Sequence, residues 1–274
     1  MKNIQFDKMQ ATGNAYIYVD SRNETLEKPE LLAAKMSDYN FGVGSDGLVL
    51  ILNSAVADFR MRMFNADGSE SAMCGNAARC IGKYVYEKKL TDKTEISLET
   101  GSGIKTLRLE VVKDKVQKIS VDMDVPRLRA VDIPVDYPDA MNVLLEGMTF
   151  TCVSMGNPHA VTFVDDVAQI DIQTTGKKIE NHPLFPERTN VEFAQIVSPD
   201  RIKMRVWERG TGETLSCGTG ACATLVAAVI KGKAKRKATI ELSGGELEVE
   251  WNEETNRVTL AGKAEWIFNG EYRY

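Results

Sequence analysis

Polar and apolar residues alternate along two stretches of the chain, residues 58–64 and 201–207, as they do in half-buried strands. Each stretch runs into a turn rich in Gly, Asp, Thr and Ser, and each turn leads to a Cys-Gly pair, Cys74-Gly75 or Cys217-Gly218. Beyond each pair the apolar residues recur at spacings of three and four, which predicts a helix. Both cysteines are therefore expected at a helix N-terminus.

The remaining apolar segments are short and predict mainly strands. They lie at residues 4–9, 16–20, 48–52, 95–99 and 106–112 in the first half, and at 149–153, 160–164, 191–197, 239–242, 247–251 and 258–260 in the second. Many strands and few helices indicate the α+β class. Residues 125–140, with three prolines, are typical of a loop and linker.

The two halves of the chain match each other at one offset. Cys74 and Cys217 are 143 residues apart, and the same offset without a gap joins further landmarks upstream. These are Gly13-Asn14 with Gly156-Asn157, Met61 with Met204, Arg62 with Arg205, Phe64 with Trp207, and Glu70 with Glu213. A sustained match of this kind predicts an ancestral duplication and two pseudo-symmetric domains.

Length and composition agree with an ordinary two-domain globular protein. The chain has 274 residues, 43% of them apolar, and a formal net charge of −5 with scattered Lys and Arg. This balance favours neither a nucleic-acid nor a membrane partner. The five cysteines and the lack of a signal-peptide pattern favour reduced thiols in the cytoplasm. Two histidines and no CxxC pair argue against a metal site.

Two matching thiols at helix N-termini suggest proton transfer. A helix N-terminus presents N–H groups and the positive end of its dipole, so it favours thiolates and can hold a carboxylate. Two opposed thiols can remove a proton from one face of a carbon and return one to the other, without pyridoxal phosphate. The offset gives Cys80, Cys152 and Cys222 no cysteine counterpart, so we expect them to be structural.

Seven motifs in order resemble those of the diaminopimelate epimerases. They are Thr12-Gly13-Asn14, Asn65-Ala66-Asp67-Gly68-Ser69-Glu70, Met73-Cys74-Gly75-Asn76-Ala77-Ala78-Arg79-Cys80, Gly156-Asn157-Pro158-His159, Arg188-Thr189-Asn190, Glu208-Arg209-Gly210 and Ser216-Cys217-Gly218-Thr219-Gly220-Ala221. The resemblance spans the whole chain. It implies interconversion of LL- and meso-2,6-diaminopimelate, on the route to lysine and peptidoglycan, with no cofactor and no metal.

The resemblance also implies an architecture. Each domain would be a mixed, barrel-like β-sheet around a central helix. Residues 1–117 with 263–274 would form the N-terminal epimerase domain, and residues 118–262 the C-terminal one. Family members often form homodimers, so a homodimer is expected, with the small-molecule substrate as the other partner.

Roles follow at the matched positions. Cys74 and Cys217 would be the catalytic acid/base pair, tuned by His159 and Glu208. Residues expected to bind the substrate carboxylate at the helix N-termini are Gly75, Asn76, Gly218 and Thr219. Those expected to hold chiefly its distal end are Asn14, Asn65, Asn157, Asn190 and Arg209. The chain departs from the family pattern at Ala15, Gly47 and Ala77, and Gly47 replaces a substrate-binding glutamine, so no contact is assigned to it.

Three alternatives stay open. A proline or hydroxyproline racemase would use the same paired thiols, although Arg209 favours a substrate with a second charged end. An isomerase of the phenazine-biosynthesis type lacks the paired cysteines. From another class, a binding protein could hold an amino acid without reaction.

Overall fold

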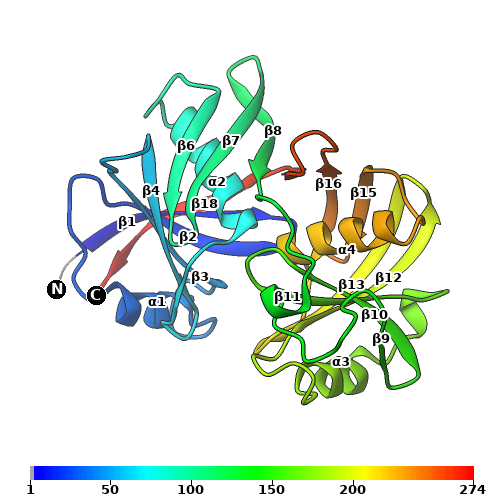
Figure 1. Ribbon diagram of the computed structural model, residues 1–274. Helices are drawn as coiled ribbons and strands as arrows, with labels where there is room; N and C mark the ends of the chain where they lie inside the picture. The colour runs from blue at the N-terminus through cyan, green and yellow to red at the C-terminus, as the bar shows by residue number, and fades with distance from the viewer. Residues whose placement is uncertain (1–2) are drawn as a thin grey trace. The chain divides into compact units, whose positions relative to one another are not determined.

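The computed structural model describes residues 3–274 and divides into two compact units (Figure 1). The first unit comprises Met1–Val121 and Gly262–Tyr274, and the second comprises Asp122–Ala261. The chain therefore leaves the first unit once and returns to it for its last strand.

The first unit is one mixed sheet wrapped around a helix. Its strands neighbour one another in the order β18, β1, β2, β3, β4, β6, β7 and β8, with the short β5 paired to β4. The pairs β2–β3 and β4–β6 are parallel and the others antiparallel. The bounds are β1 Asn3–Ala11, β2 Asn14–Asp20, α1 Pro29–Ser37, β3 Gly47–Leu52, β4 Phe59–Asn65, β5 Glu70–Ser71, α2 Gly75–Glu87, β6 Glu95–Thr100, β7 Gly103–Val112, β8 Lys115–Asp122 and β18 Glu265–Arg273.

The second unit repeats this arrangement. Its strands follow the order β9, β10, β11, β12, β13, β15, β16 and β17, with β14 paired to β13. The parallel pairs are β11–β12 and β13–β15. The bounds are η1 Ala130–Asp132, β9 Val143–Leu145, β10 Met148–Ser154, β11 Pro158–Phe163, η2 Val167–Gln169, α3 Ile172–Glu180, β12 Asn190–Ser198, β13 Arg201–Glu208, β14 Gly212–Thr214, α4 Gly218–Ile230, β15 Lys237–Leu242, β16 Gly245–Trp251 and β17 Val258–Gly262.

The two sheets match residue by residue at the predicted offset. In the first parallel pair Tyr16 lies opposite Gly47, and in the second His159 lies opposite Asn190, each residue 143 positions further along. The helices α2 and α4 have 13 residues each and keep the same offset. The duplication and the barrel-like α+β fold are therefore confirmed.

Each sheet is covered by a helix on both faces. In the first unit Ile17 packs in one core cluster with Leu32 of α1. The neighbouring Tyr18 points the other way, and its hydroxyl donates to the Ala77 carbonyl of α2 at 3.5 Å. In the second unit Phe193 packs with Ile179 of α3. The central helix α4 packs against β10, β11, β12, β15 and β16. The turn of each sheet around its central helix is visible in Figure 1.

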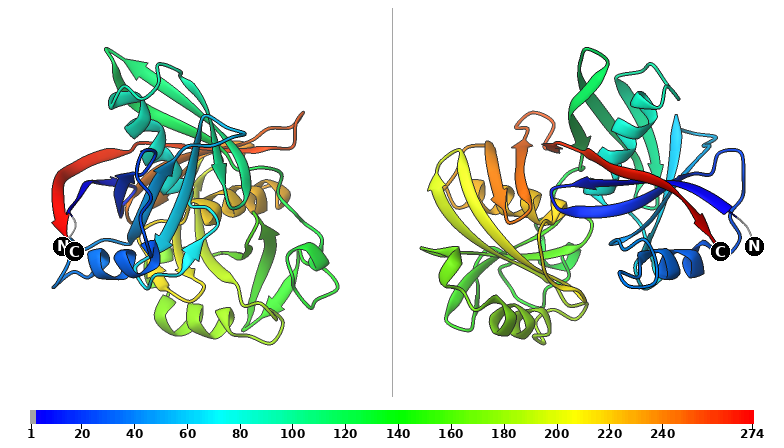
Figure 2. Two further views of the ribbon diagram at one scale, coloured as in Figure 1. Left: turned by 90° about the vertical axis from the view of Figure 1, so that its left-hand side faces the viewer. Right: turned by 180° about the vertical axis from the view of Figure 1, so that it is seen from behind.

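The last strand, β18, completes the first sheet. It pairs antiparallel with β1 over nearly its whole length, and both views of Figure 2 show the two strands alongside each other. Most of its side chains are exposed, including Ile267 and Phe268. Over residues 3–274, every helix is too short or too polar to cross a lipid bilayer.

The strands predicted from alternation and the two helices after the cysteines are present. The helices α1 and α3 and the strands β5, β8, β9, β14 and β18 were not predicted from the apolar pattern. Residues 125–140 form a loop with one short 3₁₀ turn, as expected, but they are not a linker. Ile133, Val135 and Ala140 are buried in the core of the second unit because the loop covers the α3 side of its sheet.

Candidate active site

Both central helices begin directly after a cysteine. Cys74 is the N-cap of α2 with extended backbone angles (φ −137°, ψ 123°), and Cys217 is the N-cap of α4 with nearly the same angles (φ −125°, ψ 111°). The first residues of the helices are Gly75 and Gly218. Each thiol therefore stands beside first-turn N–H groups that have no partner within an α-helix. Such a group of donors suits a carboxylate.

In the first unit the Cys74 thiol is partly buried and lies beside Tyr16. The Tyr16 hydroxyl is 3.6 Å from Cys74 Sγ, and the tyrosine side chain is almost fully buried on β2. At the same helix end, Asn76 Nδ2 donates to Asn14 Oδ1 at 2.9 Å. The structure thus brings Asn14, Gly75 and Asn76 together around Cys74.

Asn65 lies at the end of β4 and takes part in a turn. Its backbone N–H donates to the Ser69 carbonyl at 2.8 Å, and its Nδ2 donates to Ser69 Oγ at 2.9 Å. These bonds close the hairpin between β4 and β5. The side chain predicted to bind substrate thus has a structural hydrogen bond within its own hairpin.

In the second unit a chain of polar groups leads away from Cys217. Cys217 Sγ lies 3.5 Å from Thr219 Oγ1, which accepts from Asn157 Nδ2 at 3.4 Å. Asn157 Oδ1 lies 3.0 Å from His159 Nε2. His159 Nδ1 lies 2.7 Å from Glu192 Oε1. Three predicted residues, Asn157, His159 and Thr219, are therefore joined to the thiol within one unit.

Two acidic side chains, Glu192 and Glu208, act on Cys217 electrostatically. Glu208 ends β13, and its Oε1 accepts a hydrogen bond from Thr214 Oγ1. Burial raises the pKa of Glu208 above its ordinary value, partly offset by hydrogen bonds with Thr214 and Cys217. The carboxyl group therefore holds its proton more strongly than an exposed glutamate would.

The expectation that a helix N-terminus eases ionisation is wrong for Cys217. Burial, followed by the charges of Glu208 and Glu192, raises the pKa of the Cys217 thiol well above its usual range. Hydrogen bonds from Thr219 and the Gly220 backbone act in the opposite direction but are outweighed. Desolvation and two like charges penalise the thiolate more than the helix end stabilises it. Burial of Cys217 therefore favours the protonated form of its thiol.

The two remaining predicted residues are linked to each other. The Asn190 side chain is buried on β12, where its Nδ2 donates to the Pro158 carbonyl at 2.8 Å and its Oδ1 accepts from the Arg209 backbone N–H at 2.9 Å. The Arg209 guanidinium donates to the Glu187 carbonyl at 2.8 Å. Asn190 thus fixes the backbone at Arg209, whose side chain is partly exposed.

The sequence reasoning missed two residues that contact this machinery, Tyr16 and Glu192. The 143-residue offset contains the signal for both, because it pairs Tyr16 with His159 and Glu192 with the buried Val49. A carboxylate at a position whose counterpart is a core valine is expected to be buried. Gly47 is the counterpart of Asn190, and a Cβ atom on it would lie 2.1 Å from the Phe64 carbonyl oxygen. The backbone here therefore leaves no room for a side chain.

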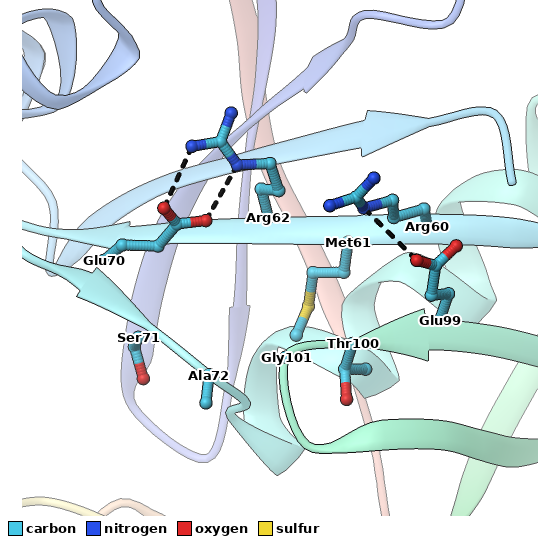
Figure 3. Close-up of a pocket in the computed structure, with 9 residues that line it drawn as sticks. All are labelled: Arg60, Met61, Arg62, Glu70, Ser71, Ala72, Glu99, Thr100 and Gly101. Atoms are coloured by element: carbon cyan, nitrogen blue, oxygen red, sulfur yellow. Dashed lines mark hydrogen bonds and ion pairs between the residues drawn. The ribbon is translucent and has the colours of Figure 1, made fainter.

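A separate pocket of about 250 Å³ lies in the first unit (Figure 3). Each of its two arginines faces a glutamate, Arg62 with Glu70 at 2.7 Å and Arg60 with Glu99 at 3.6 Å. The second unit repeats the first of these pairs as Arg205 with Glu213 at 2.8 Å. The repeated ion pair joins β4 to β5 in the first unit and β13 to β14 in the second. Its role is therefore structural. The lining residues are Arg60, Met61, Arg62, Glu70, Ser71, Ala72, Glu99, Thr100 and Gly101.

Comparison with known sequences identifies the family. The family profile described as "Diaminopimelate epimerase" matches residues 6–129 and 151–267. The chain belongs to the diaminopimelate epimerase family. A diaminopimelate epimerase of Methanococcus maripaludis (strain C5) is 52% identical over 275 residues, covering 98% of this chain and 99% of the relative. One from Acetivibrio thermocellus is 52% identical over 274 residues, covering 98% of each. The protein is thus an isomerase of the epimerase type.

Solved structures with low sequence identity share the fold of this chain. A phenazine biosynthesis protein of the PhzF family from Bacillus anthracis has a TM-score of 0.75 at 18% identity and covers all of both chains. A hydroxyproline epimerase from Agrobacterium vitis has a TM-score of 0.72 at 15% identity, covering 98% of this chain and 92% of that one. These structures support the architecture, and the family assignment rests on the sequence relatives.

Proposed function

We propose that this protein interconverts LL- and meso-2,6-diaminopimelate by passing protons between one α-carbon and two thiols, Cys74 and Cys217. One observation carries the proposal: in a chain of this family, the only cysteines related by the 143-residue offset are the N-caps of two equivalent helices. Equivalent thiols in duplicated units suit a reaction that treats two faces of one carbon alike.

The reaction requires a base, an acid and a way to stabilise charge. A thiolate removes the α-proton from one face, and the partner thiol donates a proton to the opposite face, which inverts the centre. Charge that develops on the substrate carboxylate is stabilised by donors placed for it in advance. Gly75, Asn76, Gly218 and Thr219 supply those donors at the helix N-termini, so pyridoxal phosphate and metal are not needed.

The reaction needs the two thiols in different protonation states at the start, one as the thiolate base and one as the thiol acid. The raised pKa of Cys217 supports this residue as the acid that donates, with His159 and Glu208 adjusting its proton affinity. Cys74, beside Tyr16, is then the base. The reverse reaction exchanges these roles because the thiol that has gained a proton must return it.

The distal end of diaminopimelate carries its own carboxylate and ammonium. A guanidinium binds a carboxylate through two parallel hydrogen bonds. Arg209 is partly exposed and held at its backbone by Asn190, so it can offer this fork. We assign the distal end to Arg209 with Asn14, Asn65, Asn157 and Asn190. The alternative, a proline or hydroxyproline racemase, has a substrate with no partner for Arg209.

The wider assignments are also proposals. A diaminopimelate epimerase serves lysine and peptidoglycan precursor synthesis, and we assign this protein to that route and to the cytoplasm. We propose a homodimer because β18 pairs with β1 along one edge, and Ile267 and Phe268 on it are 47% and 46% exposed. A strand edge with exposed apolar side chains is suited to pairing with a second copy.

The test is direct. Purified protein is incubated with LL-diaminopimelate in buffer that contains a chelator and no pyridoxal phosphate, and the stereoisomers are separated by chiral chromatography. We expect meso-diaminopimelate to appear with an unchanged rate at all chelator concentrations. L-Proline and trans-4-hydroxy-L-proline are tested in parallel. Turnover of either, without turnover of diaminopimelate, would favour the racemase alternative, and no turnover of any of them would favour a binding protein.

A further inference from the structure

Glu192 is a fully buried carboxylate that the proposed reaction does not use. It lies on β12 with none of its side chain exposed, and its Oε1 is 2.7 Å from Nδ1 of the equally buried His159. Within the described residues, its second oxygen, Oε2, has no hydrogen-bond partner. Burying a carboxylate is costly unless the charge is compensated. A carboxylate that is buried at such a cost and contacts a histidine of the site suggests a role at that site.

Glu192 also contacts the beginning of α4. A Cβ atom added to Gly220 would lie 2.7 Å from Glu192 Oε1 and 3.3 Å from Cys217 Sγ. Only a glycine therefore lets the carboxylate approach the first turn of the helix beside the thiol. Other titratable groups that face Glu192 are Cys152 on β10 and Glu208 on β13.

The first unit shows the same positions without this arrangement. The counterparts of Glu192, Gly220 and His159 at the 143-residue offset are Val49, Ala77 and Tyr16. Where the strand carries a valine, the helix carries an alanine, and where the strand carries a glutamate, the helix carries a glycine. The two substitutions fit each other sterically, so the buried carboxylate is an accommodated feature of the Cys217 side alone.

We propose that Glu192 is a positioning residue that acts on Cys217 through His159, Asn157 and Thr219. The contact of Glu192 Oε1 with Nδ1 fixes the orientation of the His159 ring, so that Nε2 faces Asn157 Oδ1. Asn157 then holds Thr219 Oγ1, which lies beside the thiol. The negative charge of Glu192, together with that of Glu208, also favours the protonated thiol. This inference deepens the proposed function and rests on it for the assignment of Cys217 as the acid.

The test replaces the charge and keeps the shape. In Glu192→Gln we expect kcat with diaminopimelate to fall by about tenfold while KM stays within about twofold, since the charge-assisted hydrogen bond to His159 is lost. The pH midpoint for alkylation of Cys217 by iodoacetamide, followed by peptide mass spectrometry, is expected to fall by about one unit. Glu192→Asp keeps the charge and is expected to recover part of both effects. Glu213→Gln, which removes a carboxylate paired with Arg205 in the same unit, serves as the matched control.

The readouts separate the two levels of the proposal. Unchanged kcat and an unchanged alkylation midpoint in Glu192→Gln would overturn the role of Glu192 even if the wild type is an epimerase. Failure of the wild type to convert diaminopimelate would overturn the proposed function, whereas alkylation of Cys217 still decides the role of Glu192. If Glu192→Gln does not fold, Gly220→Ala displaces the carboxylate without removing its charge, and the same loss of kcat is expected. Wild-type kcat in folded Gly220→Ala would contradict the proposal.

Discussion

Tyr16 Oη lies 3.6 Å from Cys74 Sγ, at the sheet position that His159 occupies in the second unit. The duplicated fold therefore places an aromatic, polar side chain at the same sheet position in both units. It is a tyrosine on the Cys74 side and a histidine on the Cys217 side. A tyrosine hydroxyl can donate a hydrogen bond to a thiolate without carrying a charge itself. Such a donor fits a thiol that serves as base.

Removing the Tyr16 hydroxyl should slow catalysis. In Tyr16→Phe the ring remains but the thiolate loses a donor, and a hydrogen bond to a charged group is worth roughly 1.5–3 kcal/mol. We expect kcat to fall at least about tenfold with a small change in KM. Tyr18→Phe is the matched control, because that hydroxyl donates to the Ala77 carbonyl instead. Equal activity of Tyr16→Phe and Tyr18→Phe would show that the Tyr16 contact has no catalytic role.

The two thiols should act as a unit. Cys74→Ala and Cys217→Ala are each expected to abolish epimerisation, measured by chiral chromatography, because inversion needs a group on each face. The double variant should be no worse than either single one, since residues that act together are not additive. Cys80, Cys152 and Cys222 changed to Ala should keep nearly full activity. Near-normal epimerisation by either single variant would contradict the two-thiol mechanism.

Arg209 should determine affinity more than turnover. In Arg209→Lys a point charge replaces a planar fork that binds a carboxylate through two hydrogen bonds. We expect KM for diaminopimelate to rise at least about tenfold, since a charge-assisted contact is worth roughly 1.5–3 kcal/mol. Arg201→Lys, whose side chain pairs with Glu241, is the control. A KM in Arg209→Lys that matches the control would remove Arg209 from the substrate site and favour the racemase alternative.

Buried thiols should make the protein less stable at alkaline pH. Burial raises the pKa of Cys80 and of Cys152 to about 12. The unfolded chain releases these protons from about pH 8.5, whereas the folded protein retains them. The unfolded state therefore binds fewer protons between pH 8.5 and 12, and the free energy of unfolding falls as pH rises, by up to about 1.4 kcal/mol per pH unit for each thiol.

Urea unfolding at pH 8, 9 and 10 measures this slope. Replacing Cys80 and Cys152 by Ala should flatten it, even though the variants are less stable at pH 8 because they lose packing. A slope that is the same in the wild type and in the double variant would mean that these thiols ionise alike in the folded and unfolded chain.

Much of the fold follows from local patterns in the sequence. The alternation at residues 201–207 predicts β13 because this strand buries alternate side chains. The apolar spacing after Cys217 predicts α4, although this central helix is buried on nearly all sides. The helix α1 was missed because Lys28 at its N-cap offers no capping side chain. No side chain of β18 is fully buried and its apolar residues 266–268 are consecutive, so it has no alternation to detect, and only the family resemblance placed residues 263–274 with the first domain.

The site is harder to predict because its tuning depends on burial. Along β12 the side chain of Glu192 points to the other face of the sheet from those of Val191 and Phe193. A polar residue between two apolar ones predicts that this other face is exposed to solvent. That face is instead covered by α4, so the carboxylate reaches His159 without contact with water. The raised pKa of Cys217 follows from the same desolvation and could not be inferred from its position at a helix end.

The most direct test of the two-thiol mechanism is the fate of the α-proton in deuterated water. LL-diaminopimelate is incubated with the wild-type protein, and the substrate and product are separated and analysed by mass spectrometry early in the reaction. We predict that the meso product carries one deuterium, because the donating thiol has exchanged with solvent, while the recovered LL substrate retains its proton. A meso product that keeps the original proton, or deuterium appearing equally in recovered substrate and product, would indicate a single base and contradict the pairing of Cys74 with Cys217.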